Sequence, residues 1–423
     1  MNLFRKHNSA FVSGFTLIEL LVAVVVGIIL LGGLVQIFVL TKDNYRIHQG
    51  LNYMQENLRF ATGEVGYSAR MAGFFYNIAR PTTGVSTNLA SVFGSVAGTG
   101  SVQSVNELTL LPGMAATPAC GMISWVVGIQ GFNAAATPPP CVDPANYLAG
   151  TDMVFFSYLR PVFLGLPQIR TPGTLPRVQA PTNVADADIF SNNLYAIVFD
   201  PSSKPDVNAK QGGLIGTGAM LTVPLRTASL FYRADEAEVI EKNGLVGPEN
   251  TIKRGAAMMP LQVELYYVRP CAVLVSGSAI CTAQADGGNP QPTLMRLNLG
   301  ANGTVSQEPI VSGIEQFQLE YLASGCAGYL NATQLLAWTG CTGTFTAEQR
   351  WQRVINVRVA MIARSNERAN EIDGAAYPLS ADTPAYTAAS ATQLPLNNRY
   401  RRRPSVSFMQ PRNATRPLPP VSP

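Results

Sequence analysis

The clearest pattern along the chain is a run of apolar residues near the amino terminus. It extends from Leu20 to Val39 and is interrupted only by three glycines and Gln36. About 20 apolar residues are enough for a helix to span a bilayer. A short basic segment with Arg5 and Lys6 precedes the run. Because positive residues stay on the cytoplasmic side, we expect the chain after Val39 to lie outside the cytoplasm.

The helical pattern continues beyond the apolar run. Apolar residues recur at spacings of four and three residues, at Ile47, Leu51, Met54, Leu58, Ala61 and Val65. This spacing places them on one face of a helix, with polar residues between them. We therefore predict one helix from Phe15 to about Met71, whose second half packs on a globular domain.

Beyond residue 75 the pattern changes to alternation with a period of two. Runs at 261–267, 317–321 and 355–361 alternate apolar with polar residues, which predicts half-buried strands. Further strand candidates are 106–111, 121–129, 152–164, 193–199, 219–233, 293–298 and 405–409. The predicted fold class is α+β: one long amino-terminal helix, transmembrane and then amphipathic, followed by a β-rich head with one antiparallel sheet or two small sheets.

A single carboxylate, Glu19, lies near the start of the apolar segment. A charged side chain at the centre of a bilayer costs about 2.5–3.5 kcal/mol or more. Such a group therefore needs a partner inside the membrane or a position close to the headgroups. Both explanations remain open from composition alone.

The residues GFTLIELLVA, which start at Gly14, resemble the amino-terminal signal of type IV prepilins and of type II secretion pseudopilins. The resemblance implies that prepilin peptidase cuts after Gly14 and that Phe15 becomes an N-methylated first residue. It also implies that Glu19 pairs with the new α-ammonium of a neighbouring chain in a helical stack. Gln36 stands where major pilins often carry a proline.

Two further segments, MQENLRFA at 54–61 and ARMAGF at 69–74, resemble the PilW type of minor pilin. So do the strand sequences ELYYVRPC, PTLMRLNLG, IEQFQLEY and WQRVINVRVAMIARS, and the closing NRYRRRPSVSFMQPRN. The resemblance implies a pilin-like head and a role in priming the tip of a type IV pilus, with twitching motility and cell adhesion as associated functions. It does not cover residues 80–250.

The partners that this resemblance implies are prepilin peptidase, other minor pilins, the major pilin and the inner-membrane assembly platform. The expected location is a single pass through the inner membrane with a periplasmic head, and the fibre tip after assembly. The expected segments are a leader at 1–14, a transmembrane and filament-core helix at 15–40, its amphipathic continuation at 41–75, a β-rich head at 76–410 and an extended Pro-rich tail at 411–423.

The chain has six cysteines, and an even number in an exported protein is typical of disulfides. Proximity in the sequence suggests the pairs Cys120–Cys141, Cys271–Cys281 and Cys326–Cys341. Six cysteines allow 15 connectivities, so this pairing rests on proximity alone. Free buried thiols are the alternative.

The residues that catalytic sites usually employ are scarce in this chain. The chain has only two histidines, His7 and His48, and shows no phosphate-binding or hydrolase motif. We expect no enzyme, no cofactor and no metal ion. Asp186 and Asp188 could contribute to a calcium site, but a solvated loop is the expected reading because such a site needs several more oxygens.

A basic cluster near the carboxy terminus comprises Arg399, Arg401, Arg402 and Arg403. Such clusters can bind nucleic acid or anionic headgroups. The net charge is only +4, so bulk charge does not indicate nucleic-acid binding. Solvation or salt bridges are therefore the expected role of these arginines.

Two other functions remain open. The chain could be a type II secretion pseudopilin most like the J component, since the amino-terminal signal is common to both systems. A membrane-anchored periplasmic enzyme is the second alternative, and the scarcity of histidine argues against it.

Overall fold

The computed structural model describes a long helix and most of a β-rich head. The described residues are 16–74, 127–134, 138–139, 141–160, 164–165, 177–178, 195–199, 221–224, 230–231, 257–299, 305–368, 376–377, 379, 386–387 and 400–412. The predicted strand at 106–111 and residues 121–126 of the candidate at 121–129 lie outside these residues.

Helix α1 runs from Leu17 to Met71, 55 residues in all. The chain divides into two compact units, Met1–Tyr53 and Met54–Pro423. Within the first unit, every large apolar side chain from Leu17 to Leu40 is exposed, by 47% to 80%. The chain itself provides no cover for this apolar surface, which is typical of a segment that meets a membrane or a partner.

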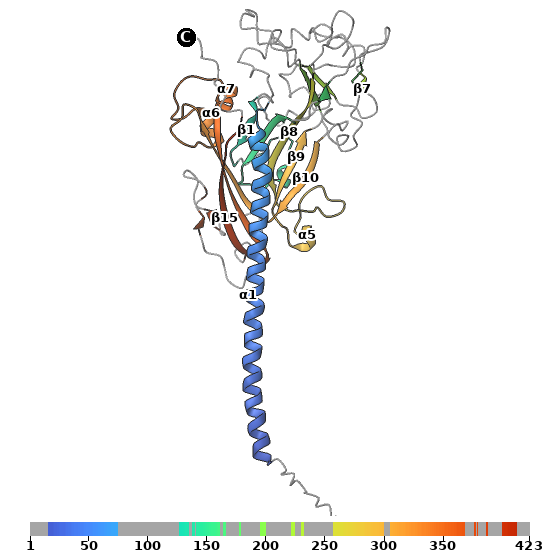
Figure 1. Cartoon of the computed structure of the whole chain (residues 1–423), viewed down its shortest axis with the longest axis vertical. Helices are drawn as coiled ribbons and strands as arrows, with labels where there is room; N and C mark the ends of the chain where they lie inside the picture. The colour runs from blue at the N-terminus through green and yellow to red at the C-terminus, as the bar shows by residue number, and fades with distance from the viewer. Residues whose placement is uncertain are drawn as a thin grey trace, which may run out of the picture. The chain divides into compact units, whose positions relative to one another are not determined.

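The second unit contains two main antiparallel sheets, shown in Figure 1. In the larger sheet, the long strand β8 (Ala257–Arg269) pairs with β2, β3, β5 and β9, while β1 pairs with β2, β6 with β5 and β10 with β9. Its other described strands are β1 (Ile129–Phe132), β2 (Met153–Leu159), β3 (Leu164–Gly165), β5 (Tyr195–Phe199), β6 (Leu221–Pro224), β9 (Thr293–Leu299) and β10 (Val305–Ser312).

The second main sheet has the strand order β11–β12–β15 among the described residues. Its strands are β11 (Ile314–Ala323), β12 (Val354–Arg368) and β15 (Tyr400–Met409). Two small pairs join β4 (Arg177–Val178) to β7 (Leu230–Phe231) and β13 (Ala376–Tyr377) to β14 (Tyr386–Thr387). The short helices are α5 (Ala285–Gly288), α6 (Ala332–Ala337) and α7 (Ala347–Gln352), together with a 3₁₀ turn at Pro144–Asn146.

The second half of α1 packs on this head along one stripe. Its buried residues recur at helical spacing: Met54, Leu58, Ala61, Val65, Ser68 and Ala69. Asn57 donates a hydrogen bond to the carbonyl of Ser312 at 2.7 Å, and the backbone N–H of Arg412 donates to the carbonyl of Arg70 at 3.1 Å. The predicted fold class, a long apolar helix followed by an antiparallel β-rich head, is confirmed.

The long strands differ from the prediction in one respect. We expected half-buried strands, but β8 and β11 are buried on both faces, including Gln262, Glu264 and Glu320. The reason is that other segments cover the polar faces. Ser68 of α1 contacts Glu264 at 2.6 Å, and Arg358 of β12 pairs with Glu320 at 2.7 Å.

The end of α1 is joined to the larger sheet by a close approach of two glycines. The N–H of Gly73 donates to the carbonyl of Ser157, and the N–H of Ser157 donates to the carbonyl of Gly128, both at 2.9 Å. Gly128 has a φ of +82°, and a Cβ at this position would lie 2.6 Å from the Cα and N atoms of Gly73. The backbone of Gly128 therefore has no room for a side chain here.

We therefore expect Gly128→Ala to destabilise the head by about 3 kcal/mol, because left-handed backbone strain adds to a steric overlap. Gly150→Ala is the matched control, since Gly150 also has a positive φ (+85°) but no heavy atom within 4 Å of a built Cβ. Its expected cost is about 1–2 kcal/mol, from strain alone. Chemical denaturation of the detergent-solubilised full chain measures both, and equal losses would contradict the close approach.

Candidate functional site

The start of α1 is capped by its own side chains. The N–H and the hydroxyl of Thr16 donate hydrogen bonds to Glu19 Oε2 at 3.0 and 2.9 Å. The N–H of Glu19 donates to Thr16 Oγ1 at 3.3 Å. These reciprocal bonds form a capping box, which satisfies two of the backbone donors that a helix leaves open at its start. The carboxylate of Glu19 therefore has a partner within its own chain.

Gly14 and Phe15, the expected cleavage and methylation site, lie outside the described residues. Position 19 is nevertheless well suited to a negative charge, because the first turn of a helix carries a partial positive charge. The sequence contained the signal for this cap, Thr-x-x-Glu before an apolar run. Glu19 was instead interpreted as the partner of another chain or as a group close to the headgroups.

A second cluster of polar residues lies where α1 meets the larger sheet. The carboxylate of Glu264 on β8 is 2% exposed and accepts a hydrogen bond from Ser68 of α1 at 2.6 Å. The hydroxyls of Ser68 and Tyr266 lie 3.0 Å apart. Burial raises the pKa of Glu264 above its ordinary value, against the hydrogen bond from Ser68 and the charge of Arg296, which lower it.

Arg296 on β9 links this cluster to the surface. Its guanidinium lies 3.2 Å from Glu64 of α1, 3.8 Å from Glu264 and 2.7 Å from Glu308 of β10. Three carboxylates from a helix and two strands thus share one cation. Because ion pairs and hydrogen bonds are directional, this network favours one position of α1 along the sheet. Apolar packing alone defines that position less sharply.

Asp152 connects the two main sheets. Its two carboxylate oxygens accept hydrogen bonds from the backbone N–H groups of Ala134, at 2.6 Å, and Leu319, at 2.7 Å. Its own N–H donates to the carbonyl of Phe317 at 2.8 Å. Burial raises the pKa of Asp152 to about 7, against these two backbone donors, and the nearby charge of Glu320 raises it further.

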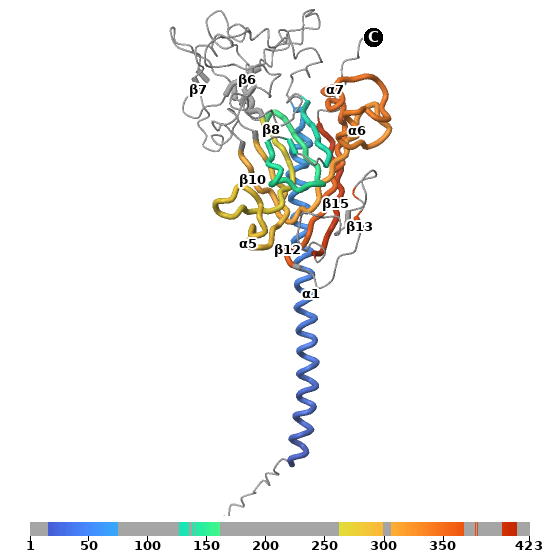
Figure 2. The backbone as a smooth tube through the Cα atoms, turned by 180° about the vertical axis from the view of Figure 1, so that it is seen from behind, coloured from blue at the N-terminus to red at the C-terminus, as the bar shows by residue number. Residues whose placement is uncertain are grey.

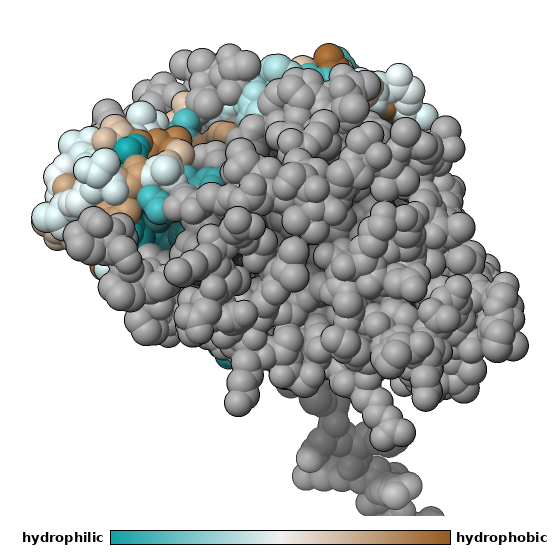
Figure 3. Space-filling model, turned by 90° about the horizontal axis from the view of Figure 1, so that it is seen from above, coloured by the Kyte–Doolittle hydropathy of each residue, from teal (hydrophilic) through white to brown (hydrophobic). Residues whose placement is uncertain are grey.

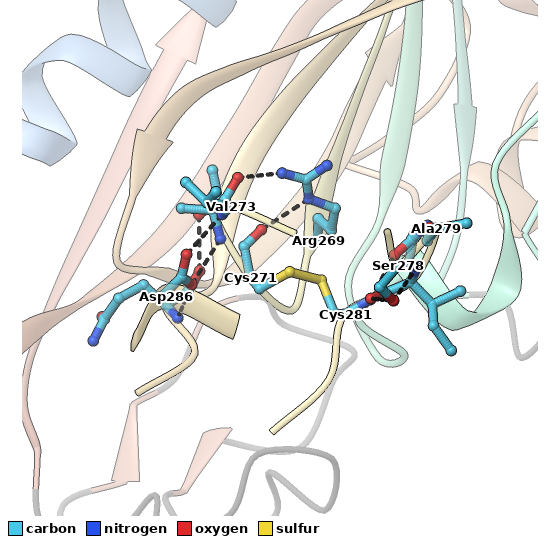
Figure 4. The surroundings of a disulfide bond; sticks show 12 residues. Arg269, Cys271, Val273, Ser278, Ala279, Cys281 and Asp286 are labelled. Carbon is cyan, nitrogen blue, oxygen red and sulfur yellow. Dashed lines mark hydrogen bonds between the residues drawn. A yellow bond between two sulfur atoms is a disulfide. The ribbon is translucent and has the colours of Figure 1, made fainter. Parts of the chain in front are cut away.

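A disulfide closes a loop between β8 and β9, as Figure 4 shows. It joins Cys271 to Cys281, one of the expected pairs. Asp286 accepts hydrogen bonds from the backbone N–H groups of Ala272, Val273 and Gln291 at 2.9, 2.6 and 2.8 Å. The disulfide and the three hydrogen bonds that Asp286 accepts together hold this loop in one conformation.

A second disulfide, Cys326–Cys341, closes the segment that carries α6. Cys141 is also disulfide-bonded, while its expected partner Cys120 lies outside the described residues. Seen from above, the described part of the surface mixes hydrophilic and hydrophobic residues on the side where Figure 1 places α6 and α7 (Figure 3).

The described part of the basic cluster has a structural role at its centre. Arg402 forms a bidentate pair with Glu315, with distances of 2.5 and 3.1 Å, and both side chains are fully buried. Arg364 of β12 lies over the ring of Tyr400, with 4.3 Å between the guanidinium carbon and the ring centroid. Arg402 is therefore not available as a surface ligand for an anion.

No group of three or more His, Cys, Asp or Glu side chains that could hold a metal ion occurs among the described residues. Asp186 and Asp188 lie outside them, as does Arg399. Within the described part of the chain, the polar clusters serve packing between elements.

The architecture defines an α+β protein with one apolar amino-terminal helix. Of the described helices, α1 alone is long and apolar enough to cross a membrane. Residues 281–413 match the family model of the type IV pilus-assembly protein W. The resemblance to the PilW type is thereby confirmed, and the match covers the part of the head from Cys281 through β15.

A solved structure that resembles the chain is a type IV-like pilin from Thermus thermophilus. The two share 13% identity over 56% of this chain and 100% of that pilin, with a TM-score of 0.18. The score is too low to bear on the fold, which follows from the described elements themselves. No curated protein matches the chain.

The pH dependence of stability follows from the raised pKa of Asp152. The carboxyl group of Asp152 binds a proton more tightly in the folded state than in the unfolded chain, where its pKa is near the ordinary value of 3.8. The free energy of unfolding should therefore fall as pH rises from about 4 to about 7, by up to about 1.4 kcal/mol per pH unit. The raised pKa of Glu264 adds a change of the same sign.

Asp152→Asn should flatten this slope, because the amide does not titrate, although it also loses one acceptor and lowers stability at every pH. The measurement is denaturant unfolding of both proteins between pH 4.5 and pH 7.5. Parallel slopes in the two proteins would show that Asp152 does not hold the proton.

Proposed function

We propose that this chain is a minor pilin that is processed by prepilin peptidase and helps to prime assembly at the tip of a type IV pilus. The carrying observation is that the head matches the pilus-assembly W family over residues 281–413 and follows a single apolar helix. The type II secretion alternative shares the amino-terminal signal, but the family match favours the pilus.

The exposed apolar half of α1 fits a subunit that lies first in the membrane and later in a fibre. In the inner membrane, lipid covers side chains such as Leu17 and Phe38, which are 80% and 70% exposed in the chain alone. In a fibre, the helices of other minor pilins and of the major pilin take the place of the lipid. Both environments are apolar, so the assembly platform transfers the helix without exposing it to water.

Glu19 makes this transfer selective. Prepilin peptidase leaves Phe15 with an α-ammonium, which methylation keeps cationic. The carboxylate of Glu19 is held by Thr16 at the start of the helix, ready to accept a cationic partner. A neighbouring chain end then completes an ion pair in an apolar surrounding, where the pair is strong and its absence is costly.

The scaffold requires no catalytic chemistry for this role. The hydroxyls and carboxylates that come together in the head, such as Ser68 with Glu264, bind one another across elements. Motive force would come from a separate ATPase of the assembly platform.

Glu19→Gln separates the two roles of this side chain. Glutamine retains the capping-box acceptor and loses the charge. We expect normal membrane insertion, measured by alkaline extraction, but incorporation into sheared fibres reduced by about tenfold or more, the factor that about 1.4 kcal/mol represents. Thr16→Val is the matched control, because it removes the side-chain cap and keeps the charge.

The outcome is decisive in both directions. If Glu19→Gln enters fibres as efficiently as the unchanged chain does, the ion pair is not needed for assembly.

Deletion of the gene distinguishes the pilus from the type II secretion system. Loss of twitching with secretion intact supports the pilus, and loss of secretion with twitching intact supports the pseudopilin alternative.

A further inference from the structure

The first disulfide loop, residues 271–281, presents apolar side chains to solvent. It contains no charged residue, and Val273, Val275 and Ile280 are 66%, 37% and 40% exposed. Three exposed apolar side chains on one short loop are typical of a site that meets an apolar partner.

Neighbouring elements hold this loop firmly. The amide nitrogen of Asn146 donates to the carbonyl of Ala279 at 2.7 Å, and its amide oxygen accepts from the N–H of Cys281 at 3.0 Å. Arg269 donates to the carbonyl of Cys271 at 2.8 Å, next to the three hydrogen bonds that Asp286 accepts (Figure 4). Because the loop is ordered before it meets a partner, docking costs it little conformational entropy.

Two cationic side chains lie at the same end of the head. The hydroxyl of Tyr400 donates to Asn289 Oδ1 at 2.6 Å, which ties the start of β15 to the segment after α5. Arg401 and Arg403 follow on β15, the first half-buried and the second exposed, and among the described residues neither guanidinium forms an ion pair. With Glu367, an exposed acid at the adjoining end of β12, these side chains leave an excess of one positive charge.

This end of the head is also where α1 enters it. Asn57 of α1 donates to the carbonyl of Ser312 at 2.7 Å. The next residue, Gly313, donates its N–H to the carbonyl of Pro292, just after the loop and α5, at 2.6 Å. Figure 1 and Figure 2 both show α5 at this lower end of the described strands.

The connection from this end of the head to the apolar run is short. Residues 41–53 belong to α1, so at about 1.5 Å per residue they span about 20 Å. With the apolar run in a bilayer, a tether of this length gives the end of the head a high effective concentration at the headgroups. Contacts that are individually weak are then enough for docking.

We propose that the first disulfide loop, together with Arg401 and Arg403, forms a docking surface for a bilayer that contains anionic phospholipids. The exposed apolar side chains of the loop enter the headgroup region, and the two guanidinium groups bind lipid phosphates. The surface holds the head against the membrane while the chain is anchored there. It requires no assembled fibre, and it therefore goes beyond the proposed function.

Photo-crosslinking of the full-length chain in lipid vesicles tests this surface. A photoreactive phenylalanine analogue replaces Val275 or, in the matched control, Thr339, an exposed residue of the second disulfide loop beyond the opposite end of β11. The vesicles consist of phosphatidylcholine, with or without phosphatidylglycerol. We expect several-fold more lipid adduct from position 275 than from position 339, and more adduct from position 275 when phosphatidylglycerol is present.

A charge variant gives a second readout. Arg403→Gln should lower the lipid adduct from position 275 in the phosphatidylglycerol vesicles by about fivefold, the contribution of one basic side chain near an anionic surface. Arg70→Gln is the matched control, because it removes the same charge from an exposed position in the last turn of α1, and it should leave the adduct unchanged. Both substitutions alter exposed side chains, so both variants should unfold at the same denaturant concentration as the unchanged chain.

Each other outcome overturns the inference. Equal lipid adducts from positions 275 and 339 show that the loop does not dock on the bilayer. Equal adducts from position 275 in the two lipid mixtures, an undiminished adduct in Arg403→Gln, or equal losses in both charge variants show that the arginines do not bind anionic headgroups. Adducts with a second copy of the chain in place of lipid assign the loop to a protein contact. None of these results depends on processing or fibre assembly, so the proposed function is tested separately.

Discussion

The burial of one stripe of α1 against two antiparallel sheets holds the described head together. Met54, Ala61, Val65 and Ala69 are fully buried on that stripe, and they belong to the same helix whose first half leaves its apolar side chains exposed. Burial of apolar area is the main stabilising contribution in such a core. A single helix thus serves as core for the head and as an apolar rod that needs lipid or other subunits.

Polar groups give this packing its register. Ser68 bonds Glu264 inside the contact, and Arg296 ties Glu64 of the helix to two strands. Asp152 does the same between the sheets, through two backbone donors. These directional contacts therefore fix the head on the second half of α1 in one register.

The sequence predicted the elements whose hydrophobic pattern extends over many residues. It missed the short helices and the strand whose pattern is interrupted. Helical spacing gave α1, and alternation gave β8, β11 and β12. Strand β10 was missed because Pro309 interrupts it, at a register shift in its pairing with β9. Helices α6 and α7 have only six residues each, and capping boxes at Asn331 and Thr346 were their available signal. The polar faces of β8 and β11 looked solvent-exposed because their partners lie far away in sequence.

The role proposed for Glu19 depends on a cationic chain end, which proteolysis after Gly14 would create. Mass spectrometry of the amino terminus of the native, membrane-extracted protein tests this most directly. We expect a chain that begins at Phe15 and carries one added methyl group. A chain that begins at any other residue, or one that retains its leader in assembled fibres, would contradict the assignment as a pilin-type subunit.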